Sequence, residues 1–304
     1  MIDLHNDTLS YLYFSYIRND FSYVEKWLKN FDINNVSGLL ANLYFMKRED
    51  MKEEMGIENI NVVEMFKIST ELFKKYLKEK EVRYSIEGCD YIESTEELEE
   101  LYNLGLRNIL LTWNNPNKYG SGNLGDYGLT EEGKKFLIKA IDLGISIDLS
   151  HMNKKTFWDT IELIKEQKSL GKKVKVIASH SNCYELCNHK RNLDDEQLKA
   201  LKSVDGLLGI VSYENFVRFS DDLKKNYLSH IDHAVSILGI DHIGVSSDNM
   251  DFLEDIYNEE LGSKIFDYKS IGNEIKELLE TKYSSEDVLK ILYKNSYNYL
   301  FKEE

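Results

Sequence analysis

Proline, cysteine and long apolar runs are all scarce in this chain of 304 residues. One proline, Pro116, and no Gly/Ser/Pro-rich stretch leave no sign of a linker, so we expect one catalytic domain over residues 1–304. Three cysteines, Cys89, Cys183 and Cys187, are too few for a disulfide framework. No run of about 18 apolar residues is present, which excludes a transmembrane helix. Because no leader-like segment opens the sequence either, we expect a cytoplasmic protein.

Basic residues are outnumbered by acidic ones, 38 against 53, which gives a formal net charge of −15. Such a surface repels phosphate backbones and anionic lipids, so neither nucleic acid nor a membrane is expected as a partner. The hydrophobic content of 42% is sufficient, over this length, to bury one large α/β core.

Short apolar runs recur along the chain, and most are separated by segments with helical periodicity. Eight runs have the length of buried strands: Ile2–Asp7, Gly38–Phe45, Val82–Gly88, Leu106–Trp113, Ile145–His151, Val174–His180, Gly206–Tyr213 and His242–Asp248. Alternation of this kind predicts a (β/α)8 barrel, the TIM barrel. An open doubly wound sheet is the alternative, but no Gly-x-Gly-x-x-Gly follows the first run.

The segments between the runs carry helix signals. Thr130 and Asn153 stand where N-caps are expected, each ahead of an apolar pattern. Helices are predicted within 51–80, from 94, from 130, and over 156–166, 194–201, 227–238, 268–280 and 284–301. The C-terminal helices, about 268–301, are expected to pack on the barrel.

Polar side chains stand at the ends of the predicted strands. His5 and Asp7 face the same way, because side chains alternate along a strand. The other polar or aromatic ends are Glu87, Trp113, His151, His180, Tyr213 and Asp248. In a (β/α)8 barrel these positions converge at the mouth that carries the active site. Buried imidazoles and carboxylates need partners, so their convergence predicts a bound cation.

Five of these residues form a candidate ligand set: His5, Asp7, Glu87, His151 and His180. Three imidazoles and two carboxylates are too many for one tetrahedral zinc with an open position. They suit two ions that share a carboxylate, and Asp248 is placed to move protons. A single histidine at a strand end more often makes a structural hydrogen bond than binds a metal. That explanation is weaker for a whole set of polar residues at one barrel mouth, so the clustered set favours a metal site.

Several ordered motifs resemble one family. They are His5-Asn6-Asp7, Glu87-Gly88, Leu104–Thr112, Ile147–His151, Ile177–Ser181, His189–Leu193, His230–His233 and Asp241–Asp248, with Asn295 in a similar context. Together they look like the membrane (renal) dipeptidase family, peptidase family M19, in a soluble bacterial-type form. The resemblance runs from residue 2 to the terminal helix.

The resemblance implies a binuclear zinc (β/α)8 barrel of the metal-dependent hydrolase type that hydrolyses dipeptides by a metal-bridging hydroxide. It implies that His5 and Asp7 bind one zinc and that His151 and His180 bind the other. Glu87 would bridge the ions, and Asp248 would handle the proton. Mn²⁺ or Co²⁺ would be substitutes, and the chain would form a homodimer.

The resemblance also implies a substrate pocket. Arg191 corresponds to the arginine that holds the C-terminal carboxylate of the substrate, a task that suits a guanidinium group. Trp113, Asn192 and Tyr213 are expected to line the pocket. Many relatives have, at the position of Trp113, a histidine that contacts the substrate, and the family's Asp-Phe-Asp-Gly is Asp248–Asp251 here.

Two alternatives follow from these departures. The barrel and metals can serve another amide, such as an N-acyl-D-amino acid, a D-configured dipeptide or a lactam. A non-enzymatic scaffold with a relic site is the other alternative, which the complete ligand set disfavours.

Two further sets of cysteines and histidines have both a functional and a structural interpretation. Cys183 and Cys187, with His180, are compatible with a soft-metal site, but we expect small buried helix residues. His230 and His233 are expected to be structural or to support the site.

Overall fold

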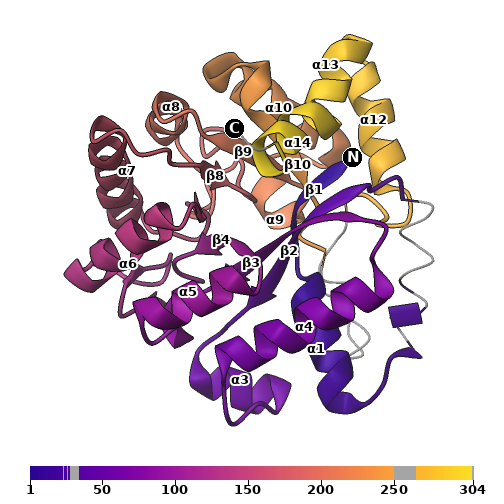
Figure 1. The fold of residues 1–304 in the computed structure, drawn as a ribbon. Helices are drawn as coiled ribbons and strands as arrows, with labels where there is room; N and C mark the ends of the chain where they lie inside the picture. Colours follow the sequence, from indigo (N-terminus) through magenta and orange to yellow (C-terminus); the bar gives the residue numbers. More distant parts are fainter. Residues whose placement is uncertain (23, 26, 28–33, 250–264, 303–304) are drawn as a thin grey trace.

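The computed structural model describes residues 1–22, 24, 25, 27, 34–249 and 265–302, and eight of its strands form a closed barrel (Figure 1). All eight are parallel to their neighbours, in the order β1-β10-β9-β8-β7-β4-β3-β2. Their bounds are β1 Ile2–Asn6, β2 Gly38–Tyr44, β3 Glu81–Glu87, β4 Leu106–Leu110, β7 Ser146–Asp148, β8 Val176–Ala178, β9 Leu207–Val211 and β10 Ile243–Ser246. The pairing of Asp3 with Val245 closes the barrel, which excludes the open sheet.

Helices surround the barrel (Figure 1). They are α1 Thr8–Arg18, α3 Arg48–Met55, α4 Val62–Tyr76, α5 Thr95–Asn103, α6 Glu131–Asp142, α7 Lys154–Ser169, α8 Asp195–Ser203, α9 Glu214–Val217, α10 Leu223–Leu238, α12 Ile271–Glu280, α13 Ser285–Leu289 and α14 Asn295–Leu300. Short 3-10 turns, η1 Cys89–Tyr91 and η2 Ile240–His242, precede α5 and β10, and a π-helical turn, η3 Lys290–Lys294, joins α13 to α14. A small hairpin of β5 Pro116–Asn117 and β6 Gly120–Ser121 follows β4. No described helix is both long and apolar enough to cross a membrane.

The helix starts follow from side-chain caps. Thr130 accepts a hydrogen bond from the Gly133 amide, and Asn153 accepts one from the Thr156 amide, so both predicted N-caps are confirmed. Asp194 and Gln197 form a reciprocal capping box at the start of α8. These caps fix where each helix begins after its strand.

Two helices differ from the sequence prediction. The helix α1 was not predicted, because its sequence has no charged face to reveal the helical period, and most of its first two turns are buried. The single helix predicted within 51–80 is two helices, since Gly56 adopts a left-handed conformation, with φ of 69°, and ends α3.

The strands end earlier than several of the predicted runs. The strand β4 ends at Leu110 rather than at Trp113, and β7 ends at Asp148 rather than at His151. The ends of β8, β9 and β10 are displaced in the same way. His5 and Glu87 therefore lie within strands, whereas the other polar or aromatic ends lie on the turns that leave the strands, namely Trp113, His151, His180, Tyr213 and Asp248.

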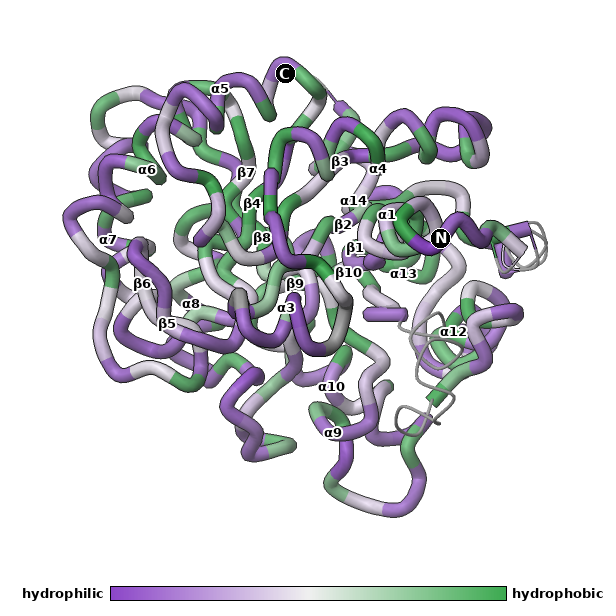
Figure 2. The backbone as a smooth tube through the Cα atoms, turned by 90° about the horizontal axis from the view of Figure 1, so that it is seen from below, coloured by the Kyte–Doolittle hydropathy of each residue, from purple (hydrophilic) through white to green (hydrophobic). Residues whose placement is uncertain are grey.

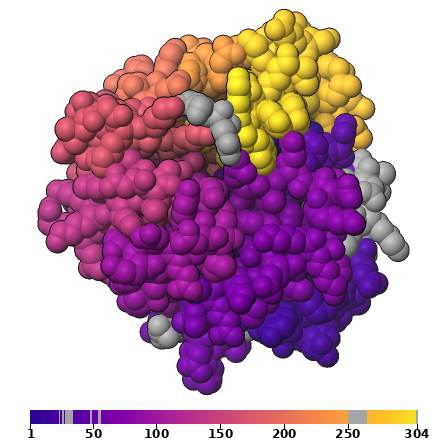
Figure 3. Space-filling model, in the orientation of Figure 1, coloured from indigo at the N-terminus to yellow at the C-terminus, as the bar shows by residue number. Residues whose placement is uncertain are grey.

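The C-terminal helices close the other end of the barrel. Leu300 packs with Ile2, Leu4, Leu40 and Ile177 in a cluster inside the barrel. In the space-filling view this segment, in yellow, lies against the purple region that includes β3 (Figure 3). Figure 2 shows apolar stretches on the central strands and more hydrophilic ones over the outer helices. These contacts place α14 against the strands, and the packing of the whole segment 268–301 on the barrel stays a prediction.

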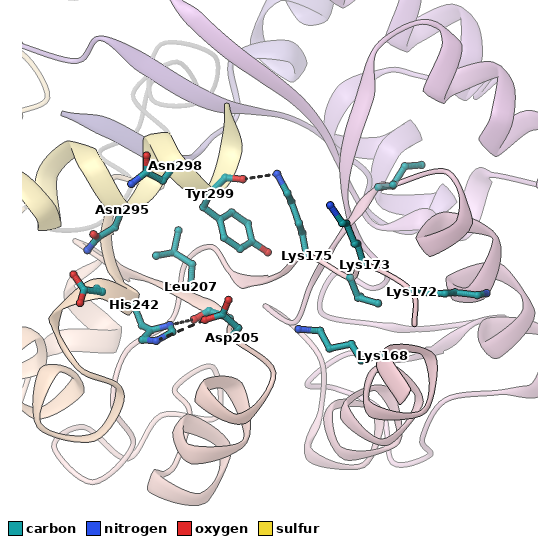
Figure 4. Close-up of a pocket in the computed structure, with 15 residues that line it drawn as sticks. Lys168, Lys172, Lys173, Lys175, Asp205, Leu207, His242, Asn295, Asn298 and Tyr299 are labelled. Carbon is teal, nitrogen blue, oxygen red and sulfur yellow. Dashed lines mark hydrogen bonds and ion pairs between the residues drawn. The ribbon is translucent and has the colours of Figure 1, made fainter. Parts of the chain in front are cut away.

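A cavity of about 970 Å³ lies at this closed end, at the starts of β7, β8 and β9 (Figure 4). Its lysines have partners. Lys175 Nζ donates to the Tyr299 carbonyl at 3.0 Å, and Lys168 Nζ donates to the Val204 carbonyl at 2.5 Å. The first contact ties the segment before β8 to α14, and the second ties α7 to the turn before β9, so we assign this end to structure.

Candidate metal centre

The first strand brings His5 and Asp7 to the open mouth of the barrel. Both side chains are buried, and His5 Nε2 lies 3.7 Å from Asp7 Oδ1. Asp7 stands just after the strand, where α1 begins. The predicted convergence of the imidazole and the carboxylate is therefore present.

Glu87, at the end of β3, lies at the middle of the cluster. Its Oε2 is 3.2 Å from His5 Nε2, and its Oε1 is 2.8 Å from His151 Nε2. His180 Nε2 lies 3.6 Å from the same Oε1. One oxygen of the carboxylate thus faces His5, and the other faces His151 and His180.

Asp248 lies on the same side of Glu87 as His5. Its Oδ1 lies 3.8 Å from His5 Nε2. One ligand atom each from His5, Asp7 and Asp248 lie within 4.8 Å of one another, as do those from His5, Glu87 and His180. All six residues predicted to act as ligands or to move protons are therefore at one site.

Two of these residues have strained backbones. His151 has φ of 67° and Asp248 has φ of 48°, in the left-handed region that side chains with a Cβ rarely occupy. Such conformations cost on the order of 1–3 kcal/mol and persist where the surrounding structure holds them. Here the turn of the chain directs both side chains into the cluster.

Three buried atoms at the centre have no hydrogen-bond partner among the described residues: His5 Nε2, Asp7 Oδ1 and Glu87 Oε1. In addition, Nε2 of His151 and Nε2 of His180 face each other at 2.9 Å. Buried polar atoms without partners are costly, and a divalent cation satisfies imidazole nitrogens and carboxylate oxygens together. The donor set fits two borderline divalent ions.

The charge states suit cation binding. Burial lowers the pKa of His151 to about 4 and the pKa of His180 well below its usual value, so both rings are neutral. Burial would raise the pKa of Glu87, but His5 and His151 hold it well below its ordinary range. Burial would lower the pKa of His5, but Glu87 and Asp7 raise it well above its ordinary value. Without a cation, a proton on His5 therefore offsets the carboxylates.

Other polar groups hold the imidazoles from behind. Ser179 Oγ lies 3.3 Å from His5 Nδ1 and 2.9 Å from His180 Nδ1. Asn114 Oδ1 lies 2.9 Å from His151 Nδ1. Neither Ser179 nor Asn114 was predicted from the sequence to have a role. Ser179 directly precedes a predicted ligand, which is the one signal for it.

Arg191 lies beside the cluster with only 6% of its surface exposed. Burial lowers the pKa of its guanidinium to about 10, which leaves it charged at neutral pH. Nη2 donates to the His180 carbonyl at 3.3 Å, while Nε has no partner among the described residues. The guanidinium also lies 5.5 Å from the centre of the Phe216 ring.

A cavity of about 250 Å³ is lined by Arg191, His151 and Asn192, among others. That volume is slightly below the usual range for small-molecule sites. The side-chain amide of Asn192 donates to the carbonyls of Cys187 and Phe216, at 2.9 and 2.8 Å. A contact between Asn192 and the substrate stays a prediction.

Trp113 stacks on His151 with ring centroids 6.2 Å apart. It therefore covers one flank of the centre. Tyr213 packs edge-on against Phe216, the ring beside Arg191, at 4.9 Å. Contacts of Trp113 and Tyr213 with a substrate stay predictions. Met250 and Asp251 lie outside the described residues.

Two cysteines and two histidines that the sequence singled out contribute no ligand atom to the two groups around His5, namely Cys183, Cys187, His230 and His233. Cys183 and Cys187 are buried free thiols, but they lie in a turn and not in the predicted helix. His230 Nδ1 accepts a hydrogen bond from the Cys183 amide, and His233 pairs with Asp195 at 2.7 Å. Both histidines therefore have structural contacts.

Known proteins resemble this chain in sequence and in fold. The family model of membrane dipeptidase (peptidase family M19) matches residues 1–300. A metallopeptidase from Rhodobacter sphaeroides, solved with a phosphinate mimic of the dipeptide L-Ala-D-Ala, has a similar fold, with a TM-score of 0.76. The two sequences are 20% identical, and the match covers 98% of this chain and 97% of the other.

Two curated relatives are similar over part of the chain. An uncharacterized protein from Klebsiella pneumoniae is 33% identical over 177 residues, which is 54% of this chain and 62% of the relative. An uncharacterized dipeptidase from Schizosaccharomyces pombe is 30% identical over 177 residues, which is 55% of this chain and 41% of the relative. This chain therefore matches less than two thirds of the length of either relative.

Zinc added to the metal-free protein should raise its melting temperature more at about pH 8 than at about pH 5. Burial raises the pKa of Asp7 to about 7, so the protonated carboxyl stabilises the metal-free fold at low pH, and this contribution is lost as the pH rises through 7. Zinc binds the ionised carboxyl, so the rise in melting temperature that zinc causes should become larger over the same pH interval. Scanning calorimetry with and without zinc measures the difference.

The control is His233→Asn, in the more exposed cluster of Glu185, Asp195 and His233. This variant should keep the full response to zinc, and Asp7→Asn should lose most of it. The opposite pattern would place the zinc at the outer cluster.

Proposed function

Because the chain belongs to the membrane dipeptidase family, peptidase family M19, we propose that it is a zinc-dependent metallo-dipeptidase that hydrolyses the peptide bond of dipeptides. The observation that carries this proposal is the position of Glu87. Its two oxygens face His5 on one side and His151 on the other, at 3.2 and 2.8 Å. A carboxylate placed in this way is suited to bridging two ions.

His5 and Asp7 would hold one ion, and His151 and His180 the other, with Glu87 between them. Zn²⁺ is the ion that we propose, with Mn²⁺ or Co²⁺ as substitutes, since imidazole and carboxylate together suit these metals. When bound, two such ions polarise the scissile carbonyl and make a water molecule nucleophilic at neutral pH.

Asp248 is the proposed proton carrier. Burial raises the pKa of its carboxyl above the ordinary value, so it gains affinity for a proton. It lies on the His5 side of the cluster and is the most exposed of the three carboxylates there, with 16% of its side chain accessible. Asp248 would take the proton of the attacking water and deliver it to the leaving amine.

Arg191 is the proposed anchor for the substrate. Its buried charge, with Nε unpaired among the described residues, is suited to a carboxylate that enters the cavity beside His151. A small cavity with a fixed cation at one wall favours substrates with a nearby C-terminal carboxylate. Dipeptides are therefore preferred over longer peptides, and Trp113, Asn192 and Tyr213 would shape the rest of the pocket.

A second candidate keeps the barrel and the ions but changes the amide. Trp113 lies against His151, where many relatives have a histidine, and the β5–β6 hairpin follows it. These features support an N-acyl-D-amino acid, a D-configured dipeptide or a lactam as the substrate. The Rhodobacter sphaeroides protein was solved with a mimic of L-Ala-D-Ala, so an L-D dipeptide belongs in the substrate panel.

We also propose that the chain forms one catalytic domain and acts as a homodimer in the cytoplasm. Its three cysteines are free and buried thiols, in keeping with a reducing compartment. Sedimentation equilibrium should give twice the chain mass, and cell fractionation should recover the protein with cytoplasmic markers. A monomer, or recovery with an envelope fraction, would contradict these two proposals.

Asp248→Asn should lower kcat for dipeptide hydrolysis by about a hundredfold to ten-thousandfold, because the proton carrier is lost. Both ions should remain bound, as measured by elemental analysis. The control is Asp241→Asn, which changes an exposed aspartate in η2, immediately before β10, that pairs with Lys290. Unchanged hydrolysis in Asp248→Asn would point to a contaminating peptidase and to the scaffold alternative.

Arg191→Met should raise KM for L-L and L-D dipeptides by about tenfold to a hundredfold, since a charged hydrogen bond is worth about 1.5–3 kcal/mol. The wild type should discriminate against dipeptide amides, and the variant should not. Arg218→Met, which changes a surface arginine paired with Glu214, serves as the control. If the wild type cleaves N-acyl substrates but no dipeptide, the second candidate replaces the first.

A further inference from the structure

Ser179 follows β8 directly and lies between two imidazoles that belong to different proposed ions. Its Oγ is 3.3 Å from Nδ1 of His5 and 2.9 Å from Nδ1 of His180. Both rings are buried, and their centroids are 3.7 Å apart. One hydroxyl group therefore contacts the rear nitrogens of two ligands from strands β1 and β8.

The capacity of a hydroxyl group decides how it serves both rings. A serine oxygen accepts two hydrogen bonds and donates one. The Oγ of Ser179 can therefore accept Nδ1–H from both rings at once, whereas it can donate its own proton to only one of them.

Asp148 is held in place. Its Oδ1 accepts hydrogen bonds from the amides of Ser150 and Ser179, at 3.0 and 3.1 Å, and its Oδ2 accepts one from Asn108 Nδ2 at 3.4 Å. Its side chain is fully buried. The backbone at Ser179, and with it the position of the side chain, is therefore held by a buried carboxylate below the cluster.

We propose that Ser179 is a positioning residue for both metal subsites, because its Oγ accepts Nδ1–H of His5 and Nδ1–H of His180. This arrangement leaves Nε2 of each ring unprotonated and directed at the centre, the tautomer that a metal ligand requires. The inference rests on the proposed function, since it assigns the two rings to two ions. It couples the subsites through one side chain behind them, in addition to Glu87 between them.

His151 provides the contrast. Its Nδ1 lies 2.9 Å from Asn114 Oδ1, so a separate residue orients this ring. Asn114 should therefore matter to one ion only, whereas Ser179 should matter to both. That asymmetry separates the proposal from a general loss of packing.

The experiment compares the zinc-loaded wild type with Ser179→Ala and Asn114→Ala. Each protein is equilibrated with a series of chelator concentrations, and the ions that remain per chain are counted by elemental analysis. Loss of a group that orients a ligand costs about tenfold to a hundredfold in metal affinity. Ser179→Ala should release both ions at correspondingly lower chelator concentrations, and Asn114→Ala should release one.

The matched control is Ser246→Ala. Ser246 is a buried serine at the end of β10, and its hydroxyl has no partner among the described residues. This variant should retain both ions as the wild type does. Ser179→Thr restores a hydroxyl at the tested position and should recover most of the affinity.

A second readout follows the tautomers directly. In the zinc-loaded wild type with ¹⁵N-labelled histidine, Nδ1–H of His5 and of His180 should be protected from exchange with solvent. Both protons should lose that protection together in Ser179→Ala, and Nδ1–H of His151 should keep it. Circular dichroism of the same samples verifies that the barrel is folded.

Two results would overturn the proposal. One is retention of both ions in Ser179→Ala at the chelator concentrations of the wild type, and the other is loss of the His180 ion alone. A wild-type protein that binds no divalent ion would instead overturn the proposed function, and this is seen before any variant is compared.

Discussion

The carboxylate of Glu87, buried between imidazoles from three other strands, is the contact on which this structure depends. It faces His5 from β1, His151 from the turn after β7 and His180 from the turn after β8. An ionised carboxylate in a closed, mostly apolar barrel is tolerated only where opposite charge compensates it. The barrel mouth must therefore hold either a proton on the cluster or cations within it, and the polar residues around Glu87 are arranged for cations.

Beneath the ligands, two buried carboxylates brace neighbouring strands in the same manner. Asp3 accepts hydrogen bonds from the amide and the hydroxyl of Ser247, and Asp148 accepts one from the amide of Ser179. Each aspartate stands on a strand that carries or precedes a ligand, and each serine directly precedes another residue of the site. The strained turns at His151 and Asp248 are held by this layer, so the positions of the ligands follow from the barrel wall below them.

Much of this could be predicted from the sequence. Buried parallel strands are continuous apolar runs, so the eight strands and the polar residues that follow them were visible, and closure then brought His5 to Asp248. The helix α1 could not be seen, since its buried residues leave no alternating charge. Ser179 and Asn114 were missed because each has a partner far away in sequence: Asn114 contacts a ring 37 positions later, and Ser179 contacts, besides the adjacent His180, a ring 174 positions earlier. Small hydroxyl and amide groups carry no periodic signal, and only the folded chain shows what they orient.

The two halves of the centre differ in how far apart their residues lie along the chain. His151 and His180 lie on turns that follow adjacent strands, 29 positions apart, so a loop of modest length brings them together. His5 meets Asp248 only when β1 pairs with β10 across almost the entire chain, a closure marked by the pairing of Asp3 with Val245. Joining two points of the chain costs more entropy when the chain between them is longer. The His151–His180 half of the centre can therefore form locally, whereas the His5–Asp248 half forms only when the barrel closes. The contact between His5 and Asp248 therefore reports that the first and last strands have met.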